Sequence, residues 1–267
     1  MSRITEKFNT LKILKKNAIA SFISSFDPNF SISKKILFEL PKSGADIIEI
    51  GLPFSDPMAD GPTIQKSSIR AINSGFTLAK TLSMVSSFRK VDNVTPIVFM
   101  GYFNTIYQFG LEEFFLQSKR CGVDGLIVVD LPPEEDSRLK NLQNKYNIDL
   151  IRLVTPTTDT KRLKKILKNS SGFIYYVSIL GITGTKKPSL IKVKNSVKKI
   201  KKISSLPVLV GFGIKDISQV EEISSFAEGS VVGSSIVKII ENSLTEKLSS
   251  KDLVNRISEY VTSLTKR

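Results

Sequence analysis

The chain has 267 residues, with 39 Lys and Arg against 25 Asp and Glu, a formal net charge of +14, one cysteine and no histidine. The missing histidine excludes a Ser-His-Asp triad, a Cys-His pair and the usual His/Cys zinc sites, and the single Cys121 excludes an internal disulfide. Acid-base chemistry must therefore use Asp, Glu, Tyr or Lys. No carboxylates are spaced for an oxygen-ligand metal site, so we expect no metal.

Residues 1–20 carry scattered charges and no uninterrupted apolar run, which predicts an amphipathic first helix rather than a secretory signal. No apolar run is long enough to span a membrane, so we expect a cytoplasmic protein without membrane contact. Beyond this helix, short β-rich apolar runs alternate with helical patterns. The expected strands are 18–24, 46–50, 96–100, 125–130, 149–154, 173–178, 207–211 and 229–233.

Segments with helical spacing of apolar residues lie between and after these strands. The expected helices are 32–43, 63–74, 111–121, 134–146, 160–168, 189–202, 216–226, 234–242 and 251–264. Repeated strand-helix units in a chain of this length predict a (β/α)₈ TIM barrel, an α/β fold, with an extra N-terminal helix and extra terminal helices. An open doubly wound sheet is the alternative, but no GxGxxG follows the first strand. No linker divides the chain, so we expect residues 1–267 to form a single domain.

The positive charge raises the question of nucleic-acid binding. The lysine clusters KRLKKILK (161–168) and IKVKNSVKKIKK (191–202) also contain apolar residues at helical spacing. Each cluster therefore predicts the solvent face of an amphipathic helix. Neither cluster interleaves aromatic residues with arginines as a single-strand groove does, so we expect no nucleic-acid partner.

The stretch EIGLPFSDPMADGPTIQ (49–65) places an acid within an apolar strand and two more acids in the turn region after it. Alternation puts Ile47 and Glu49 on one face of the strand and Ile48 and Ile50 on the other. A buried carboxylate without partners has a raised pKa, and the carboxyl end of a barrel strand is where catalytic groups lie. We therefore favour Glu49 as a general acid/base over a carboxylate paired with a lysine or with backbone donors.

Asp60 stands in a different local pattern, Asp60-Gly61-Pro62, which is typical of a helix start. Taken alone, it is best explained as a helix N-cap. Its position on the same strand-end loop as Glu49 favours a second catalytic carboxylate, because two acids in different environments can divide acid/base and electrostatic roles.

Glycines follow the last strands. Gly211 and Gly213 come after strand 207–211, and Gly233 and Ser234 open the next helix. Backbone N–H groups at a helix start bind anions, and the loops after strands 7 and 8 of a barrel often hold phosphate. This pair of loops predicts a phosphorylated substrate. Tyr175, within strand 173–178, is best explained from the sequence alone as a core residue.

The stretch IEIGLPFSDPMADGPTIQ (48–65) closely resembles the signature of the tryptophan synthase α subunit family. The similarity extends across nearly the whole chain. It includes FISSFDP (22–28), PIVFMGYFNTIYQFG (96–110), GLIVVDLPPEE (125–135), YYVSILGITGT (175–185), VLVGFGI (208–214) and VGSSIVK (232–238). Phe26 stands where the family usually has Gly, and Met100 where it often has Leu; neither change removes a chemical group.

The resemblance implies cleavage of indole-3-glycerol phosphate to indole and glyceraldehyde 3-phosphate in a TIM barrel. It maps the catalytic residues onto Glu49 and Asp60. It maps phosphate contacts onto Gly184, Gly213, Gly233 and Ser234, with Gly211 and Phe212 beside them. Phe22, Met100, Tyr175 and Thr183 match positions that line the substrate or the mobile loop.

The resemblance also implies a partner. Pro53, Asp56 and Pro57 of the loop 53–60, together with Asn104, match regions that contact a β subunit in an α2β2 complex. That subunit carries pyridoxal phosphate and receives the indole for tryptophan synthesis. No cofactor is implied in this chain, because protonated indole can hold the electrons of the broken bond.

Two other functions remain as alternatives. Indole-3-glycerol phosphate synthase is a sister barrel with similar phosphate loops, but it normally needs a catalytic lysine at an early strand end, and the first three strands have none. A basic RNA-binding or scaffold protein without activity is the other alternative. The presence of both Glu49 and Asp60 argues against it.

Overall fold

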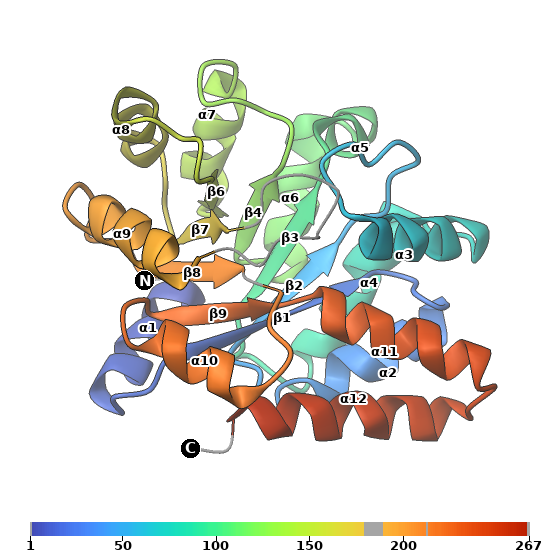
Figure 1. The fold of residues 1–267 in the computed structure, drawn as a ribbon. Coiled ribbons are helices and arrows are strands. Elements are labelled where there is room, and N and C mark those ends of the chain that lie inside the picture. Colours follow the sequence, from blue (N-terminus) through green and yellow to red (C-terminus); the bar gives the residue numbers. More distant parts are fainter. Residues whose placement is uncertain (1, 179–188, 212, 266–267) are drawn as a thin grey trace.

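The structure, a computed structural model, describes residues 2–178, 189–211 and 213–265. In this part of the chain, parallel strands form one sheet in the order β5-β4-β3-β2-β1-β9-β8-β7-β6, surrounded by helices (Figure 1). The strands are β1 (Ala18–Ser24), β2 (Ile47–Gly51), β3 (Ile97–Gly101), β4 (Gly125–Val128), β5 (Asp149–Leu150), β6 (Arg152–Val154), β7 (Ile174–Val177), β8 (Val208–Gly211) and β9 (Gly229–Val232).

The two ends of this sheet are consecutive in the sequence. β5 pairs with β4 and β6 pairs with β7, and only Ile151 separates them. They are the two halves of the strand predicted at 149–154, and the Ile151 N–H still donates to the Leu126 carbonyl at 3.0 Å. The sheet is therefore a nearly closed barrel, and the predicted TIM-barrel architecture is confirmed.

In the described residues, helices cover the outer face of the barrel and, with the first of them, its amino-terminal end. They are α1 (Arg3–Ile13), α2 (Phe30–Glu39), α3 (Pro62–Asn73), α4 (Leu78–Arg89), α5 (Phe103–Phe109), α6 (Leu111–Cys121), α7 (Ser137–Tyr146), α8 (Thr160–Lys168), α9 (Leu190–Lys201), α10 (Ile217–Ser224), α11 (Ser234–Thr245) and α12 (Ser250–Thr265). The sequence analysis missed α4 and α5. Thr77 marks the start of α4, since its side chain accepts the Lys80 N–H, but the Ser- and Thr-rich helix has modest intrinsic propensity.

Alternation along each strand divides the apolar residues into two clusters. Ile48 and Ile50 belong to the large cluster between the strands and the helices, whereas Ile47 belongs to the cluster inside the barrel. The predicted orientation of β2 is thus confirmed, and Glu49 shares the inward face with Ile47.

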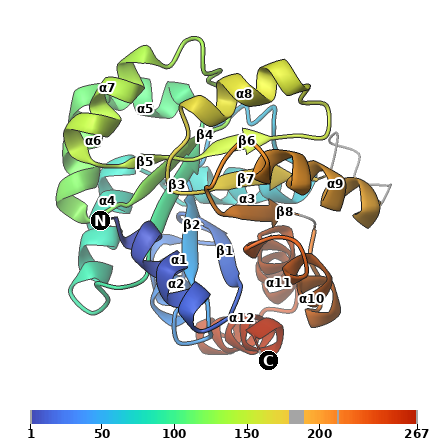
Figure 2. The ribbon, with the colours of Figure 1, turned by 90° about the vertical axis from the view of Figure 1, so that its left-hand side faces the viewer.

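Helix α1 closes the amino-terminal end of the barrel. Its Ile4, Phe8 and Leu11 belong to the interior cluster, and the Phe8 and Phe173 rings lie 6.1 Å apart between centroids. Figure 2 shows α1 lying across this end of the strands. The predicted amphipathic first helix is confirmed, and its apolar face is part of the barrel core.

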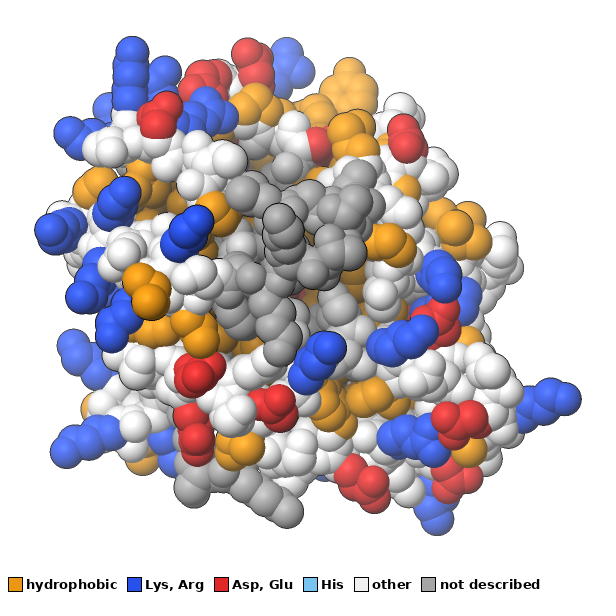
Figure 3. Space-filling view, in the orientation of Figure 1, with side chains coloured by type: hydrophobic (Ala, Val, Ile, Leu, Met, Phe, Trp, Pro, Cys, Tyr) orange, Lys and Arg blue, Asp and Glu red, His pale blue; other side chains and the backbone are white. Residues whose placement is uncertain are grey.

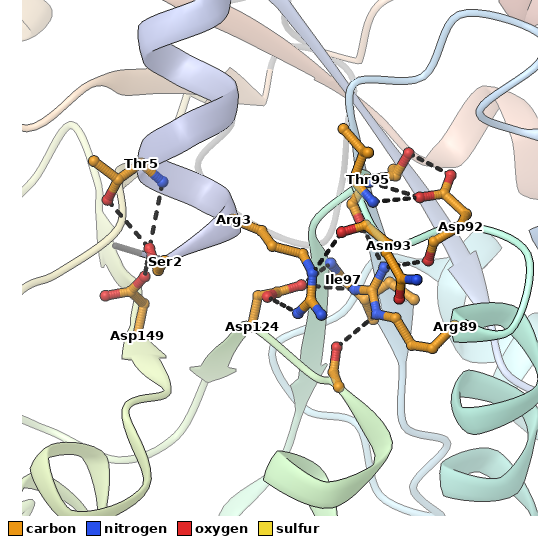
Figure 4. A network of polar contacts seen from close by, with 12 residues as sticks. Ser2, Arg3, Thr5, Arg89, Asp92, Asn93, Thr95, Ile97, Asp124 and Asp149 are labelled. Atoms are coloured by element: carbon orange, nitrogen blue, oxygen red, sulfur yellow. Dashed lines mark hydrogen bonds and ion pairs between the residues drawn. The ribbon is translucent and has the colours of Figure 1, made fainter.

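A polar network fixes the start of α1 (Figure 4). Arg3 Nη1 lies 2.8 Å from Asp124 Oδ1, and Arg89 Nη2 lies 2.7 Å from Asp124 Oδ2. Ser2 donates to Asp149 Oδ2 at 2.8 Å. Because Asp124 directly precedes β4 and Arg89 ends α4, the network joins three elements at the closed end of the barrel.

The lysine-rich segments form helices as predicted. Their apolar residues are buried: Leu163, Ile166 and Leu167 in α8, and Val193, Val197 and Ile200 in α9. On the face seen in Figure 3, Lys and Arg side chains spread over the surface and are interspersed with Asp and Glu. Within the described residues, no helix combines the length and the apolar character needed to cross a membrane.

Candidate active site

A cavity of about 970 Å³ lies at the carboxyl ends of the strands. Many of the side chains and glycines expected at the site line it: Phe22, Asp60, Met100, Tyr175, Gly211, Gly213, Gly233 and Ser234. They come from β1, the loop after β2, β3, β7, the end of β8 and the segments after β8 and β9. Thr183, Gly184 and Phe212 lie outside the described residues.

The sequence analysis named no site residue in the segment after β4. Val129, Asp130 and the two prolines that follow line the cavity, as does Leu153 of β6. Asp130 Oδ1 accepts the Phe103 N–H at 2.8 Å and so satisfies a donor at the start of α5. The sequence signal that could have identified Asp130 as a site residue was an acid at the carboxyl end of a buried barrel strand.

Glu49 is fully buried, with 0 % of its surface exposed. Neither of its carboxylate oxygens has a hydrogen-bond partner among the described residues, so neither a lysine nor a backbone donor of that part of the chain satisfies it. Burial raises the pKa of Glu49 to about 8. A carboxyl group with this pKa can hold a proton near neutral pH and still release it, which suits acid/base exchange.

Asp60 lies at the end of the loop after β2 and lines the cavity. Tyr102 Oη donates to Asp60 Oδ2 at 3.2 Å and accepts the Ala59 N–H at 2.9 Å. Burial raises the pKa of Asp60 to about 6, although the hydrogen bond from Tyr102 opposes this shift. The alternative role as a helix cap is wrong, because Gly61 is the N-cap of α3 and no side chain caps it.

Helix α3, which begins directly after Asp60, is fixed to the segment after β1. Arg70 donates from Nε to Asp27 Oδ1 and from Nη2 to Asp27 Oδ2, both at 2.7 Å. Ser67 of the same helix also donates to Asp27, whose side chain is 0 % exposed. This bidentate contact, made from the last turn of α3, fixes the helix to the segment after β1.

Tyr175 lines the cavity instead of lying wholly in the core. Burial raises the pKa of its phenol, and the negative charges of Glu49 and Asp60 raise it further. A Cβ atom on Gly211 would lie only 2.9 Å from the Tyr175 hydroxyl. The absence of a side chain at Gly211 therefore leaves room for the phenol beside the two acids.

The segments after β8 and β9 meet at the cavity. Gly213 has φ +66°, a left-handed conformation that suits glycine, and Gly233 is the N-cap of α11. Ser235 donates to the Ile214 carbonyl at 2.6 Å and joins the start of α11 to the segment after β8. Free N–H groups at the start of an α-helix attract anions, so this corner of the cavity is suited to phosphate.

The residues expected to contact a partner lie on the rim of the cavity. Asp56 and Asn104 are exposed, Pro57 is half-buried and Pro53 is buried. The Phe54 ring stacks on Tyr102 with centroids 5.1 Å apart and connects the loop after β2 to α5. Met58 of this loop and Tyr107 of α5 are 65 % and 55 % exposed, so both elements present a large apolar side chain to solvent.

Within the described residues, no three His, Cys, Asp or Glu side chains are grouped so that they could hold a metal ion. Among the acids in or near the cavity, Glu49 and Asp60 have raised pKa values, whereas Asp130 is engaged at the start of α5. Their raised pKa values distinguish them from surface carboxylates, whose pKa values are lowered by neighbouring cations, such as Glu241 at about 2.

Comparisons with known proteins support one family. The family model described as tryptophan synthase alpha chain matches residues 8–266. The tryptophan synthase subunit alpha of Legionella pneumophila is 34% identical, with a TM-score of 0.90 over 99% of this chain and 97% of that one. A protein from Aquifex aeolicus is 37% identical, with a TM-score of 0.87 over 99% of both chains. A chain of the tryptophan synthase a2b2 complex from Pyrococcus furiosus is 34% identical, with a TM-score of 0.85 over 94% of this chain and 98% of that one. The barrel, its cavity and these similarities together show that the chain is an enzyme that belongs to the tryptophan synthase alpha chain family.

Proposed function

We propose that the chain is a carbon-carbon lyase that cleaves indole-3-glycerol phosphate to indole and glyceraldehyde 3-phosphate. The observation that carries the proposal is the buried carboxyl group of Glu49, which has no hydrogen-bond partner among the described residues and lies on a strand that leads to the cavity containing Asp60. This reaction is the α reaction of the family, and it needs a proton donor and acceptor but no histidine.

The reaction begins with proton transfer from the Glu49 carboxyl group to C3 of the indole ring. The ring nitrogen then carries positive charge, which the ionised Asp60 carboxylate stabilises. The Glu49 carboxylate next takes the proton of the glycerol hydroxyl, a carbonyl forms, and the bond between C3 and the glycerol carbon breaks. Its electrons return to the ring, so indole leaves neutral and Glu49 is protonated again.

The phosphate group is held in this proposal by the segments after β7, β8 and β9. Gly213, Gly233 and Ser234 line the cavity at the start of α11, whose N–H groups attract an anion. Phe22, Met100 and Tyr175 of the cavity contact the rest of the substrate in this proposal. The resemblance also assigns Gly184, Phe212 and Thr183 to the substrate, but these lie outside the described residues.

We further propose a β subunit as partner in an α2β2 complex, as in the Pyrococcus furiosus protein. The surface offered to it contains the exposed Asp56 and Asn104 and the half-buried Pro57, together with the exposed Met58 of the same loop and Tyr107 of α5. Pro53, which the resemblance also assigns to this contact, is buried in the chain. The indole released here passes to that subunit, which carries pyridoxal phosphate. This chain contributes no cofactor, because the indole ring itself accepts the electrons.

The proposal is tested by mixing the purified chain with indole-3-glycerol phosphate and following indole release, with and without a cognate β subunit. We expect slow release alone and faster release with the β subunit. Glu49→Gln keeps the size of the side chain but cannot exchange the proton, so turnover should be lost while substrate binding persists. Full activity of Glu49→Gln would overturn the role of Glu49, and no indole release under any condition would overturn the reaction.

A further inference from the structure

Glu49 is out of reach of the cavity in this structure. It is 0 % exposed, its oxygens contact no solvent, and it is not among the residues that line the cavity. A group that exchanges protons with a substrate must contact it during turnover. Some side chain between Glu49 and the cavity therefore has to move.

Strand register identifies that side chain. Phe22 of β1 is the pairing neighbour of Glu49, and both point into the barrel. Phe22 also lines the cavity. It is thus in contact with the open space on one side and next to the buried acid on the other.

The direction of the Phe22 ring is set by a glycine. Gly51 is two residues beyond Glu49 on the same inward face of β2, about 6.6 Å nearer the carboxyl end of the strand. A Cβ atom on Gly51 would lie 2.5 Å from Phe22 Cζ and 2.8 Å from Cε2. The ring therefore occupies the space that a Gly51 side chain would fill, on the cavity side of Glu49.

Gly51 has no conformational reason to be glycine. It does not have a positive φ, and the next backbone atom that its Cβ would meet, the Ile23 carbonyl oxygen, lies at an ordinary 3.6 Å. The Phe22 ring is the obstacle to a side chain at this position. Gly233, directly after the other neighbouring strand β9, is also close, with its hypothetical Cβ 3.2 Å from Phe22 Cβ.

We propose that the Phe22 ring, held in the space that Gly51 leaves open, is a cap that separates Glu49 from the cavity until the indole ring of the substrate displaces it. The proposal rests on the proposed lyase reaction and makes Phe22 and Gly51 positioning residues for its acid/base. An aromatic ring that replaces another keeps water away from the carboxyl group during the exchange.

The cap explains the dryness of Glu49. The residues that pair with Glu49, Phe22 and Val98, are both apolar. The titratable groups that face this part of the interior are Tyr175 of β7, whose pKa Glu49 raises, and Asp60 of the loop after β2. Removing the ring admits water, which stabilises the carboxylate, so the pKa of Glu49 should fall from about 8 towards its ordinary value.

The direct test is a carbon-13 NMR titration of the free full-length chain labelled at the glutamate side-chain carboxyl carbon, with Glu49→Gln used to assign the signal. Phe22→Ala and the milder Phe22→Leu should each lower the titration midpoint of Glu49, the former by about one unit or more. Leu153→Ala, which enlarges the same cavity from a strand that does not pair with β2, should leave the midpoint unchanged.

Gly51→Ala is a second, independent test, because the added methyl group displaces the Phe22 ring without removing it. The midpoint of Glu49 should fall here too. In the double variant Phe22→Ala/Gly51→Ala, the second substitution should add no further shift, since no ring remains to displace. If the midpoint shifts of Phe22→Ala and Gly51→Ala added up in the double variant, the two residues would act separately, and the cap would be contradicted.

The outcomes separate this proposal from the reaction. If Phe22→Ala and Phe22→Leu leave the midpoint of Glu49 unchanged while the wild-type chain releases indole, the cap is wrong and the lyase stands. If these variants lower the midpoint but the wild-type chain releases no indole with or without the β subunit, Phe22 shields Glu49 as proposed, but the lyase reaction and the displacement of the ring by indole are wrong. In an active enzyme, the alkaline limb of kcat/KM should move to lower pH in Phe22→Leu together with the midpoint.

Discussion

Tyr102 donates a hydrogen bond to Asp60 at 3.2 Å across 42 residues of sequence, and the same hydroxyl accepts the Ala59 N–H at 2.9 Å. The Tyr102 hydroxyl therefore holds both the Asp60 carboxylate and the Ala59 backbone at the end of the loop after β2. The Tyr102 ring also stacks on Phe54, so Tyr102 connects Phe54 of this loop to Asp60 in the cavity.

Removal of this hydroxyl should change the pH dependence of the enzyme. The hydrogen bond favours the ionised form of Asp60, so Tyr102→Phe should raise the pKa of Asp60 further above about 6, by up to about one unit. If ionised Asp60 is the active form, the acidic limb of kcat/KM moves to higher pH. Tyr107→Phe removes an equivalent hydroxyl from the exposed face of α5 and is the control, whose profile should match that of the wild type.

The wild-type profile itself is expected to be bell-shaped. Activity needs ionised Asp60, with a pKa of about 6, and protonated Glu49, with a pKa of about 8. The rate constant kcat/KM should therefore rise through the first value and fall through the second. Measurement of indole release from pH 5 to 9.5 checks this; a rate that keeps rising above pH 8.5 would assign the proton differently.

Stability should also depend on pH through Glu49. Its pKa is raised from 4.5 in the unfolded chain to about 8 in the folded one, so the folded state binds more protons between these values. The free energy of unfolding consequently falls as pH rises from 4.5 to 8. Glu49→Gln has no group that titrates at this position and should not lose stability in this way. The melting temperature of the variant minus that of the wild type should therefore increase from pH 4.5 to pH 8.

Thermal unfolding of both proteins at pH 4.5, 6 and 8 measures this difference. Glu259→Gln, an exposed substitution of the same kind on α12, is the matched control and should follow the wild type at each pH. A constant difference between Glu49→Gln and the wild type at all three pH values would contradict burial of an ionisable group.

The Asp27–Arg70 contact offers a test of the anchor of α3. Arg70→Ala leaves the buried Asp27 carboxylate without its cation and should lower the free energy of unfolding by about 3–5 kcal/mol. Lys66→Ala breaks an ion pair with Glu241 from the same helix, but the Lys66 side chain is 61% exposed, so the loss should be within about 1 kcal/mol. Urea titrations of the two variants would give the comparison, and equal losses would contradict the anchoring role.

Much of the fold was predictable because its strands are buried on both sides and leave continuous apolar runs in the sequence. The strand at 149–154 was found as one unit, but its division at Ile151 depends on pairing with two different neighbours, which no local pattern records. Helix α5 was missed because seven residues rich in aromatics carry little periodicity, and its start is satisfied by Asp130 from another strand.

The site was predictable where chemistry and position coincide. Glu49 stood out as an acid in an apolar strand, and the structure places it buried and without partners among the described residues. The environment of each acid was not predictable. The link from Tyr102 to Asp60 and the fit of the Phe22 ring beside Gly51 are contacts between separate strands and loops, and they exist only after the barrel closes.

The position of α1 bears on how ligands reach the interior. Ile4, Phe8 and Leu11 fill the amino-terminal end of the barrel with apolar side chains, whereas the cavity with Asp60 lies at the opposite, carboxyl end of the strands. We therefore expect substrate and both products to enter and leave on the face that also carries the loop after β2. A partner that covers this face would control the direction in which indole leaves.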